Sequence, residues 1–345
     1  MYKSIFDDSI RIAEGKESLI YMNSTAATYE HEMAGNIIDL EEFNRDWRTI
    51  GVPDYRINDE TLAYSINAIL HDFDPNNWGI ISQTKFYKLL YLLSDNLKKD
   101  GIDIGLPHYW YRYGPIVPYF ILPEDVLIRD QKNWGTAVIM GHRRRFELSQ
   151  SLKEVIDNEV KALWDQYHEL KTKKIVLDVY KKAPYEFQRK FKDFIIHIDI
   201  KIRLRQSVPS YPLKEREDIR RLEDAIDSFE ELEFPQIYDD LLQWRLITKY
   251  SIEQLSYIDL TFLNRVTNIY WDMLFCKYLR VKTTENLPQN LSRKWERDLP
   301  ESAEIFRKEF KDLECYFYSN IYRPTCRISK NMRTAYCDCI RSLLK

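Results

Sequence analysis

Four cysteines near the end of the chain are, by residue type, the best candidates for binding a metal ion. Cys315, Cys326, Cys337 and Cys339 fall within 25 residues. A structural zinc site needs converging thiolates and usually includes a Cys-x-x-Cys pair, which this sequence lacks. On a helix, Cys337 and Cys339 would point about 200° apart and could not both face one ion. We therefore expect buried thiols, with no metal and no cofactor.

A run of three arginines offers phosphate-binding chemistry. Arg143, Arg144 and Arg145 follow His142 within residues 141–206, which carry 16 Lys or Arg and 10 Asp or Glu. Consecutive guanidinium groups can neutralise a nucleic-acid backbone. The three arginines are candidate nucleic-acid contacts, and the alternative interpretation is a solvent-exposed turn.

Motifs that would specify catalysis are absent from the sequence. It contains no GxxxxGK[ST], GxGxxG, HExxH or GxSxG. Adjacent carboxylates are frequent among 54 acidic residues, but none has a recognisable catalytic partner nearby. We predict no catalytic residue. A metal-dependent nuclease with the loosely spaced Asp…Glu-x-Lys pattern stays open.

An aromatic stretch at residues 108–120, HYWYRYGPIVPYF, is the most distinctive feature of the sequence. Gly114 can adopt backbone angles that a β-carbon would disfavour, and Pro115 fixes the next φ angle. The Gly-Pro pair therefore predicts a rigid bend that carries aromatic side chains. The candidate partner-binding residues are Tyr109, Tyr111, Arg112 and Tyr119, and the sequence leaves open which of the four face outward.

The helix that would support this stretch is expected directly before it, at about residues 83–100. Ser82 is a suitable N-cap, and Gly101 is suited to end the helix. An apolar stripe with helical spacing predicts a position at the centre of the domain. Its members are Phe86, Leu89, Leu90, Leu93 and Leu97.

Other elements of the first half follow from periodicity. Amphipathic helices are expected at about 58–73 and 149–170, and another should end near Ala183 because Pro184 cannot continue it. Short strands are expected between residues 123 and 148. Residues 195–204 alternate between Ile or Leu and polar residues, which predicts a further strand.

The second half is expected to be wholly helical. The proline-containing segment near residue 208 indicates a boundary, followed by helices at 215–231, 235–248, 251–280, 301–320 and 329–345. We predict three parts: an acidic N-terminal extension at 1–57, a compact, mainly helical domain with a few short strands at 58–206, and an all-α domain at 207–345. The fold class is mainly α.

Composition sets the broad class of protein. The chain has 345 residues, 44% hydrophobic residues, 9 glycines and a net charge of −3. These values favour folded helical domains and give no overall signal for nucleic-acid binding. Without an apolar signal region or a span of about 18 apolar residues, we expect a cytoplasmic protein outside the membrane.

Two of these features together resemble the signature of the Panacea, or SocA-like, antitoxin family. That family has a KLxKLLY-type helix followed by a W-x-YGPV-type segment. The resemblance covers about residues 58–195. It departs from the family where Tyr180-Lys181 and Pro184-Tyr185 replace Thr-His and Pro-Trp. The matching residues are Lys85, Lys88, Leu89, Leu90, Tyr91, Trp110, Tyr113, Gly114, Pro115, Ile116 and Val117.

The resemblance implies a small helical domain that binds other proteins. Family members neutralise unrelated toxins or act as adaptors for proteolysis, often in mobile or antiviral loci, and no catalytic residue carries over. The residues assigned to the scaffold are Lys85, Leu89, Tyr91, Trp110, Tyr113, Gly114 and Pro115.

Three hypotheses follow. The first is a non-catalytic antitoxin-like interaction module that binds a toxin or another defence component. The second is a nucleic-acid-binding defence or regulatory protein that uses residues 141–206. The third is a helical toxin or nuclease with an unrecognised site. The sequence specifies neither the partner nor the oligomeric state.

Overall fold

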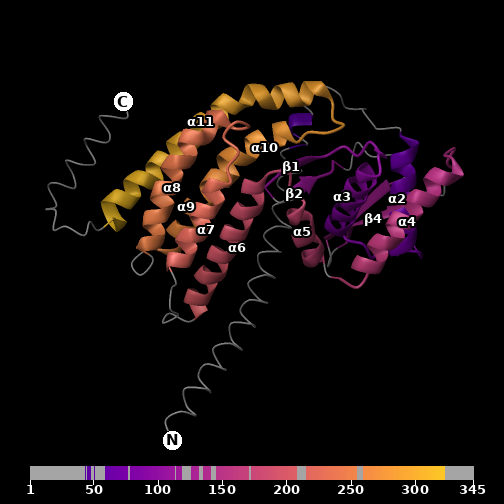
Figure 1. Ribbon diagram of the computed structural model, residues 1–345, viewed down its shortest axis with the longest axis horizontal. Helices are drawn as coiled ribbons and strands as arrows, with labels where there is room; N and C mark the ends of the chain where they lie inside the picture. The colour runs from indigo at the N-terminus through magenta and orange to yellow at the C-terminus, as the bar shows by residue number, and fades with distance from the viewer. Residues whose placement is uncertain are drawn as a thin grey trace, which may run out of the picture. The chain divides into compact units, whose positions relative to one another are not determined.

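The computed structural model is mainly α-helical, which confirms the predicted fold class (Figure 1). It describes residues 43, 45–47, 50, 59–76, 78–112, 114–118, 126–131, 135–140, 145–170, 172–207, 215–254 and 259–322. These residues form two compact units. Residues 43–183 and 279–297 make up the hairpin unit, and residues 184–278 and 298–322 make up the helical unit.

The hairpin unit is organised around one helix, α3. Its helices are α2 (Glu60–Phe73), α3 (Gln83–Lys99), α4 (Gln150–Tyr167) and α5 (Thr172–Lys181). Helix α3 contacts α2, α4, α5 and both sheets, so its predicted central position is confirmed. The five predicted stripe residues are fully buried.

The ends of α3 are set by local chemistry. The Ser82 hydroxyl accepts a hydrogen bond from the Lys85 N–H at 3.3 Å, as expected of an N-cap. After the helix, Gly101 has a φ of +78°, the left-handed conformation that commonly ends helices. Both predicted helix boundaries are therefore confirmed.

Two antiparallel hairpins complete this unit. Strands β1 (Tyr109–Tyr111) and β2 (Gly114–Ile116) pair with Tyr111 opposite Gly114. Strands β3 (Val126–Gln131) and β4 (Gly135–Met140) pair with Val126 opposite Met140. The aromatic stretch and the segment after it therefore form short strands.

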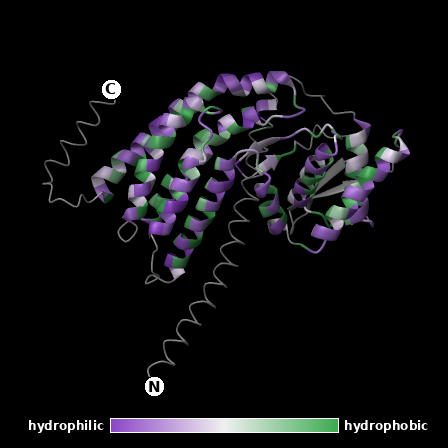
Figure 2. Cartoon of the chain, in the orientation of Figure 1, coloured by the Kyte–Doolittle hydropathy of each residue, from purple (hydrophilic) through white to green (hydrophobic). Residues whose placement is uncertain are grey.

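The helical unit contains α6 (Glu186–Ser207), α7 (Glu215–Asp227), α8 (Tyr238–Glu253) and α9 (Leu260–Tyr270). Both units contain residues of α10 (Cys276–Lys282) and α11 (Gln289–Tyr316). The helical unit also contains a short 3-10 helix, η2 (Pro235–Ile237), and two short π-helical segments, η3 (Trp271–Phe275) and η4 (Phe317–Ile321). Helices α6 to α9 pack side by side, and their mixed hydropathy in Figure 2 is typical of amphipathic helices.

The strand predicted at residues 195–204 is wrong, because these residues belong to α6. The alternation of Ile with polar residues coincides with a second pattern that has helical spacing. Side chains buried at this spacing are Phe187, Phe191, Phe194, Ile195, Ile198 and Ile202. Helix α6 extends over 22 residues, much longer than an ordinary strand.

The boundaries between the two compact units differ from the domain boundaries that were predicted from the sequence. The predicted boundary at residue 207 follows α6, whereas the two units divide before it, at Pro184. Helix α11 starts at Gln289 and continues through Pro300, although a helix was expected only from 301. Most of the acidic extension and the predicted helix at 329–345 lie outside the described residues.

Candidate protein-interaction site

The bend at Gly114 packs directly on α3. Gly114 has a φ of +99°, and a Cβ atom there would lie 3.1 Å from Lys88 Nζ. The Lys88 side chain is 2% exposed, and its Nζ donates a hydrogen bond to the Pro115 carbonyl at 3.0 Å. A buried ammonium needs such partners, so glycine at 114 leaves room for the lysine that supports the bend.

Trp110 packs the β1–β2 hairpin against helices α3 and α5. Its ring meets Tyr91 of α3 at 5.5 Å and Tyr180 of α5 at 5.9 Å, both edge-on. The Tyr180 hydroxyl also donates to the Arg112 carbonyl at 3.0 Å, beside the bend. Tyr180 therefore holds the hairpin in place.

Lys85 joins the start of α3 to the end of α4. Its Nζ donates to the carbonyls of His168 and Leu170, each at 3.3 Å, and burial lowers its pKa. The structure therefore places the predicted scaffold residues Lys85, Leu89, Tyr91, Trp110, Gly114 and Pro115 on α3 and the hairpin packed against it. Tyr113 lies outside the described residues.

Two of the predicted partner-binding residues are buried, which corrects that prediction. Tyr109 and Tyr111 are 2% and 1% exposed. Tyr109 packs against the rings of Phe43 and Trp295, and Tyr111 lies beneath Arg280. Residues distant in sequence therefore cover two rings that were candidate partner contacts.

Of the other two candidate partner-binding residues, the structure describes Arg112. Arg112 is half-buried, and its guanidinium lies over the Tyr111 ring and donates to the Tyr111 hydroxyl at 3.2 Å. Tyr119 lies outside the described residues. The aromatic stretch therefore acts mainly as scaffold within the part that can be described.

The covering residues come from a return segment, residues 279–297, which the sequence assigned to another domain. The Asp46 carboxylate accepts hydrogen bonds from Lys294 Nζ at 2.9 Å and Trp295 Nε1 at 2.8 Å. Arg280 lies 3.7 Å from the same carboxylate and stacks over the Trp295 ring. These buried contacts anchor both ends of the return segment.

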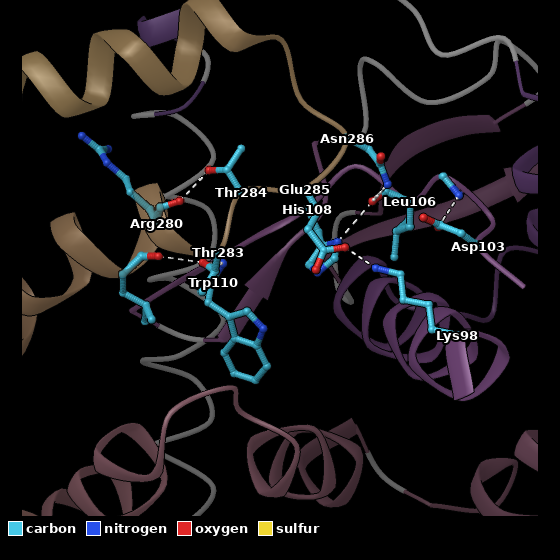
Figure 3. A network of polar contacts seen from close by, with 12 residues as sticks. Lys98, Asp103, Leu106, His108, Trp110, Arg280, Thr283, Thr284, Glu285 and Asn286 are labelled. Carbon is cyan, nitrogen blue, oxygen red and sulfur yellow. Dashed lines mark hydrogen bonds and ion pairs between the residues drawn. The ribbon is translucent and has the colours of Figure 1, made fainter. Parts of the chain in front are cut away.

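Between the anchors, residues 283–286 cross the open edge of β1, and we call them the strap (Figure 3). Glu285 exchanges two backbone hydrogen bonds with His108, at 2.9 and 3.1 Å. The Trp110 N–H donates to Thr283 Oγ1 at 2.9 Å, and the Asn286 side chain donates to the Leu106 carbonyl at 3.2 Å. Lys98 forms an ion pair with the Glu285 carboxylate.

His108 is the titratable group beneath the strap. Burial lowers the pKa of its imidazole, while the Glu285 carboxylate acts in the opposite direction. The ring bonds to the Leu106 carbonyl through Nδ1 at 3.1 Å, and its Nε2 lies 3.9 Å from Glu285. A neutral histidine therefore suits this position.

A second surface feature is the display loop, residues 74–80, between α2 and α3. Trp78 and Ile80 are 72% and 65% exposed. The buried Asp74 carboxylate accepts hydrogen bonds from the N–H groups of Trp78, Gly79 and Ile80, at 2.9, 2.6 and 3.3 Å. A fixed backbone therefore holds two large apolar side chains in solvent.

Sequence reasoning treated residues 74–79 only as a connection and missed this loop. A signal was present, since Trp78 and Ile80 place two large apolar residues in a connecting loop, where polar ones are usual. The sequence could not show that the carboxylate would bind three backbone groups and be buried.

The remaining predicted residues contribute little to this surface. Arg145 is exposed, and Arg143 and Arg144 lie outside the described residues. Cys315 is a half-buried free thiol, whereas Cys326, Cys337 and Cys339 also fall outside them. Within the described part, no group of three His, Cys, Asp or Glu side chains is arranged to hold a metal ion.

The helical unit contains a separate buried cluster of ionisable groups. Asp218 of α7 is fully buried and contacts Lys201 Nζ at 2.6 Å and His197 Nε2 at 3.1 Å, both from α6. His197, a polar residue of the segment that was predicted as a strand, is therefore half-buried between two helices. The cluster supplies the charge pairing that a buried carboxylate requires.

Comparisons with family models, curated proteins and solved structures found no match. Among the helices that the structure describes, none has the length and apolar character needed to cross a membrane.

Proposed function

We propose that this protein is a non-catalytic interaction module that acts like a Panacea antitoxin. It would neutralise a partner protein or adapt it for proteolysis, in a toxin–antitoxin or antiviral defence locus. The paired motif supports this proposal, because its two halves pack on each other as one rigid scaffold. A reduced, cytoplasmic setting suits the five cysteines and the lack of a Cys-x-x-Cys pair.

The display loop is the observation that carries the proposal. Tryptophan is enriched at the energetic centres of protein interfaces, and a rigid loop loses little conformational entropy when it binds. The Asp74 hydrogen bonds fix the loop before any partner arrives. Trp78 and Ile80 are therefore the proposed contact residues for an apolar hollow on the partner.

Co-expression with the product of the neighbouring gene tests this function. The wild-type chain should co-purify with that product and relieve any growth arrest it causes. Trp78→Ala combined with Ile80→Ala should lose both effects. Leu232→Ala is the matched control, since Leu232 is 96% exposed but belongs to the helical unit.

Failure of the wild-type chain to bind or protect would contradict the proposed function. Loss of both effects in the Leu232 variant as well would contradict the assignment to the display loop. A partner that binds only through nucleic acid would be released by nuclease treatment, which would favour the second hypothesis.

A further inference from the structure

We propose that the open edge of β1 is a binding site for an extended peptide, and that the strap occupies this site in the resting chain. The site consists of the backbone groups of Leu106, His108 and Trp110 together with the Lys98 ammonium. The inference rests on the proposed function in one respect: the peptide that replaces the strap is taken to be a segment of the partner protein.

The backbone groups of His108 and Trp110 bond to the strap in the way that they would bond to an additional β-strand. The N–H and C=O of His108 both bond to Glu285, in an antiparallel bridge of one residue pair. The next outward N–H, that of Trp110, meets a side-chain hydroxyl because the strap has already turned away there. Proteins commonly bind extended peptides by adding a strand to such an edge.

The strap shows which ligand chemistry the site accepts. A carboxylate in the position of Glu285 reaches Lys98, and a hydroxyl two residues earlier receives the Trp110 N–H. An amide in the position of Asn286 donates to the Leu106 carbonyl. The expected ligand is therefore an extended segment with the pattern Thr-x-Glu-Asn, or one with equivalent hydroxyl, carboxylate and amide groups.

The strap is held more weakly than its anchors. Glu285 and Asn286 are exposed, whereas Arg280 and Trp295 are buried. The Lys98–Glu285 pair is partly solvated, with 33% and 46% of the two side chains exposed, so it contributes little stability. Opening residues 283–286 would break a few polar contacts and leave the apolar anchors in place.

Local contacts hold the start of the strap to α10 independently of β1. Asn286 has a φ of +53°, a left-handed conformation that asparagine tolerates better than most residues. The Thr283 and Thr284 hydroxyls donate back to the carbonyls of Leu279 and Arg280, at 2.7 and 2.5 Å. These two hydrogen bonds join the strap to α10 and would survive its release from β1.

Peptide binding to the full-length chain tests the site. The probe is a fluorescent peptide of residues 281–288, Val-Lys-Thr-Thr-Glu-Asn-Leu-Pro, measured by anisotropy. Glu285→Pro in the protein removes the N–H that bonds to His108 and should open the strap. This variant should bind the peptide at least about tenfold more tightly than wild type, since the strap no longer competes.

A peptide with Thr283→Val and Glu285→Lys is the matched control and should bind at least about tenfold more weakly, having lost one hydrogen bond and the charge pairing. If Glu285→Pro does not fold, Thr283→Val in the protein provides the same test with a smaller change. Equal binding by wild type and a folded strap variant, or no binding by that variant, would overturn the proposal.

Amide hydrogen exchange gives an independent result without any ligand. The His108 amide should exchange through local opening, faster than the α3 core amides of the same unit. Exchange of His108 only on unfolding of the whole unit would show that the strap does not open. Neither experiment uses Trp78 or Ile80, so its outcome is separate from the test of the display loop.

Discussion

The display loop and the return segment each place a tryptophan beside a buried carboxylate, with opposite results. In the loop, Asp74 binds backbone N–H groups, and the Trp78 side chain is left in solvent. In the return segment, Asp46 binds the Trp295 indole N–H itself, and the ring is fully buried. The two carboxylates therefore differ in what they bind. Asp74 binds backbone N–H groups and leaves its tryptophan available for a partner, whereas Asp46 binds the indole and its tryptophan stabilises the fold.

Replacing the two tryptophans should give the largest contrast. Trp295→Ala should lower the free energy of unfolding of the hairpin unit by about 3–5 kcal/mol, because it empties a packed aromatic site and leaves Asp46 with fewer donors. Trp78→Ala should change it by less than about 0.5 kcal/mol. Urea unfolding followed by circular dichroism measures both, and similar losses would remove the distinction.

The bend at Gly114 gives the next largest effect. Gly114→Ala should cost about 3 kcal/mol, since an added Cβ both strains the backbone and crowds Lys88 Nζ. Gly101→Ala is the matched control, with a φ of +78° and nothing within 4 Å of the added atom. It should cost about 1 kcal/mol. Equal costs would show that the Lys88 contact is unimportant.

The carboxylate of the display loop should matter less for folding than for binding. Asp74→Ala removes three hydrogen bonds and should cost about 2 kcal/mol while freeing the backbone around Trp78. Asp74→Asn keeps one acceptor and should lie between wild type and Asp74→Ala. Partner affinity should fall in the same order, and full affinity in Asp74→Ala would show that loop rigidity is not needed.

Acid should loosen the strap region by a smaller, graded amount. The pKa of His108 is lowered in the folded state, so below about pH 6.5 the unfolded chain binds a proton that the folded chain does not. This contribution to stability is complete above pH 6.5 and is lost as pH falls through the folded pKa. The expected slope is at most about 1.4 kcal/mol per pH unit.

His108→Gln should remove this pH dependence, because glutamine keeps a polar side chain but does not titrate. Unfolding curves of both proteins between pH 5 and 8 provide the measurement. Glu285, Lys98 and Asp103 also act on the imidazole, so a dependence that persists in His108→Gln would assign the effect to other groups.

A local feature could be predicted from the sequence where all the residues that determine it lie in one short segment. Ser82 begins α3 through its own side chain, and Gly101 ends it through its own backbone conformation. The apolar residues from Phe86 to Leu97 recur with a single, helical spacing. The bend at Gly114 follows from the Gly-Pro pair in the same way. The strand prediction for residues 195–204 was wrong because a strand-like alternation and a helical spacing of apolar residues overlap there. Only the phenylalanines that precede the segment distinguish the two patterns.

Features that depend on distant residues could not be predicted. Tyr109 and Tyr111 are buried by Phe43, Arg280 and Trp295, which lie far away in the sequence. The sequence of the return segment does not show which unit it joins, since the segment begins in α10 and ends in α11. Asp74 has an acidic side chain, and its burial depends on the fold of the loop around it.

The most direct test of the proposed function is the affinity of the purified partner for three versions of the full-length chain. Isothermal titration should give Trp78→Ala a dissociation constant at least about 30-fold above wild type, as for an interface hot spot, with an unchanged melting temperature. Leu232→Ala should bind like wild type. Equal affinity of wild type and Trp78→Ala would contradict the account.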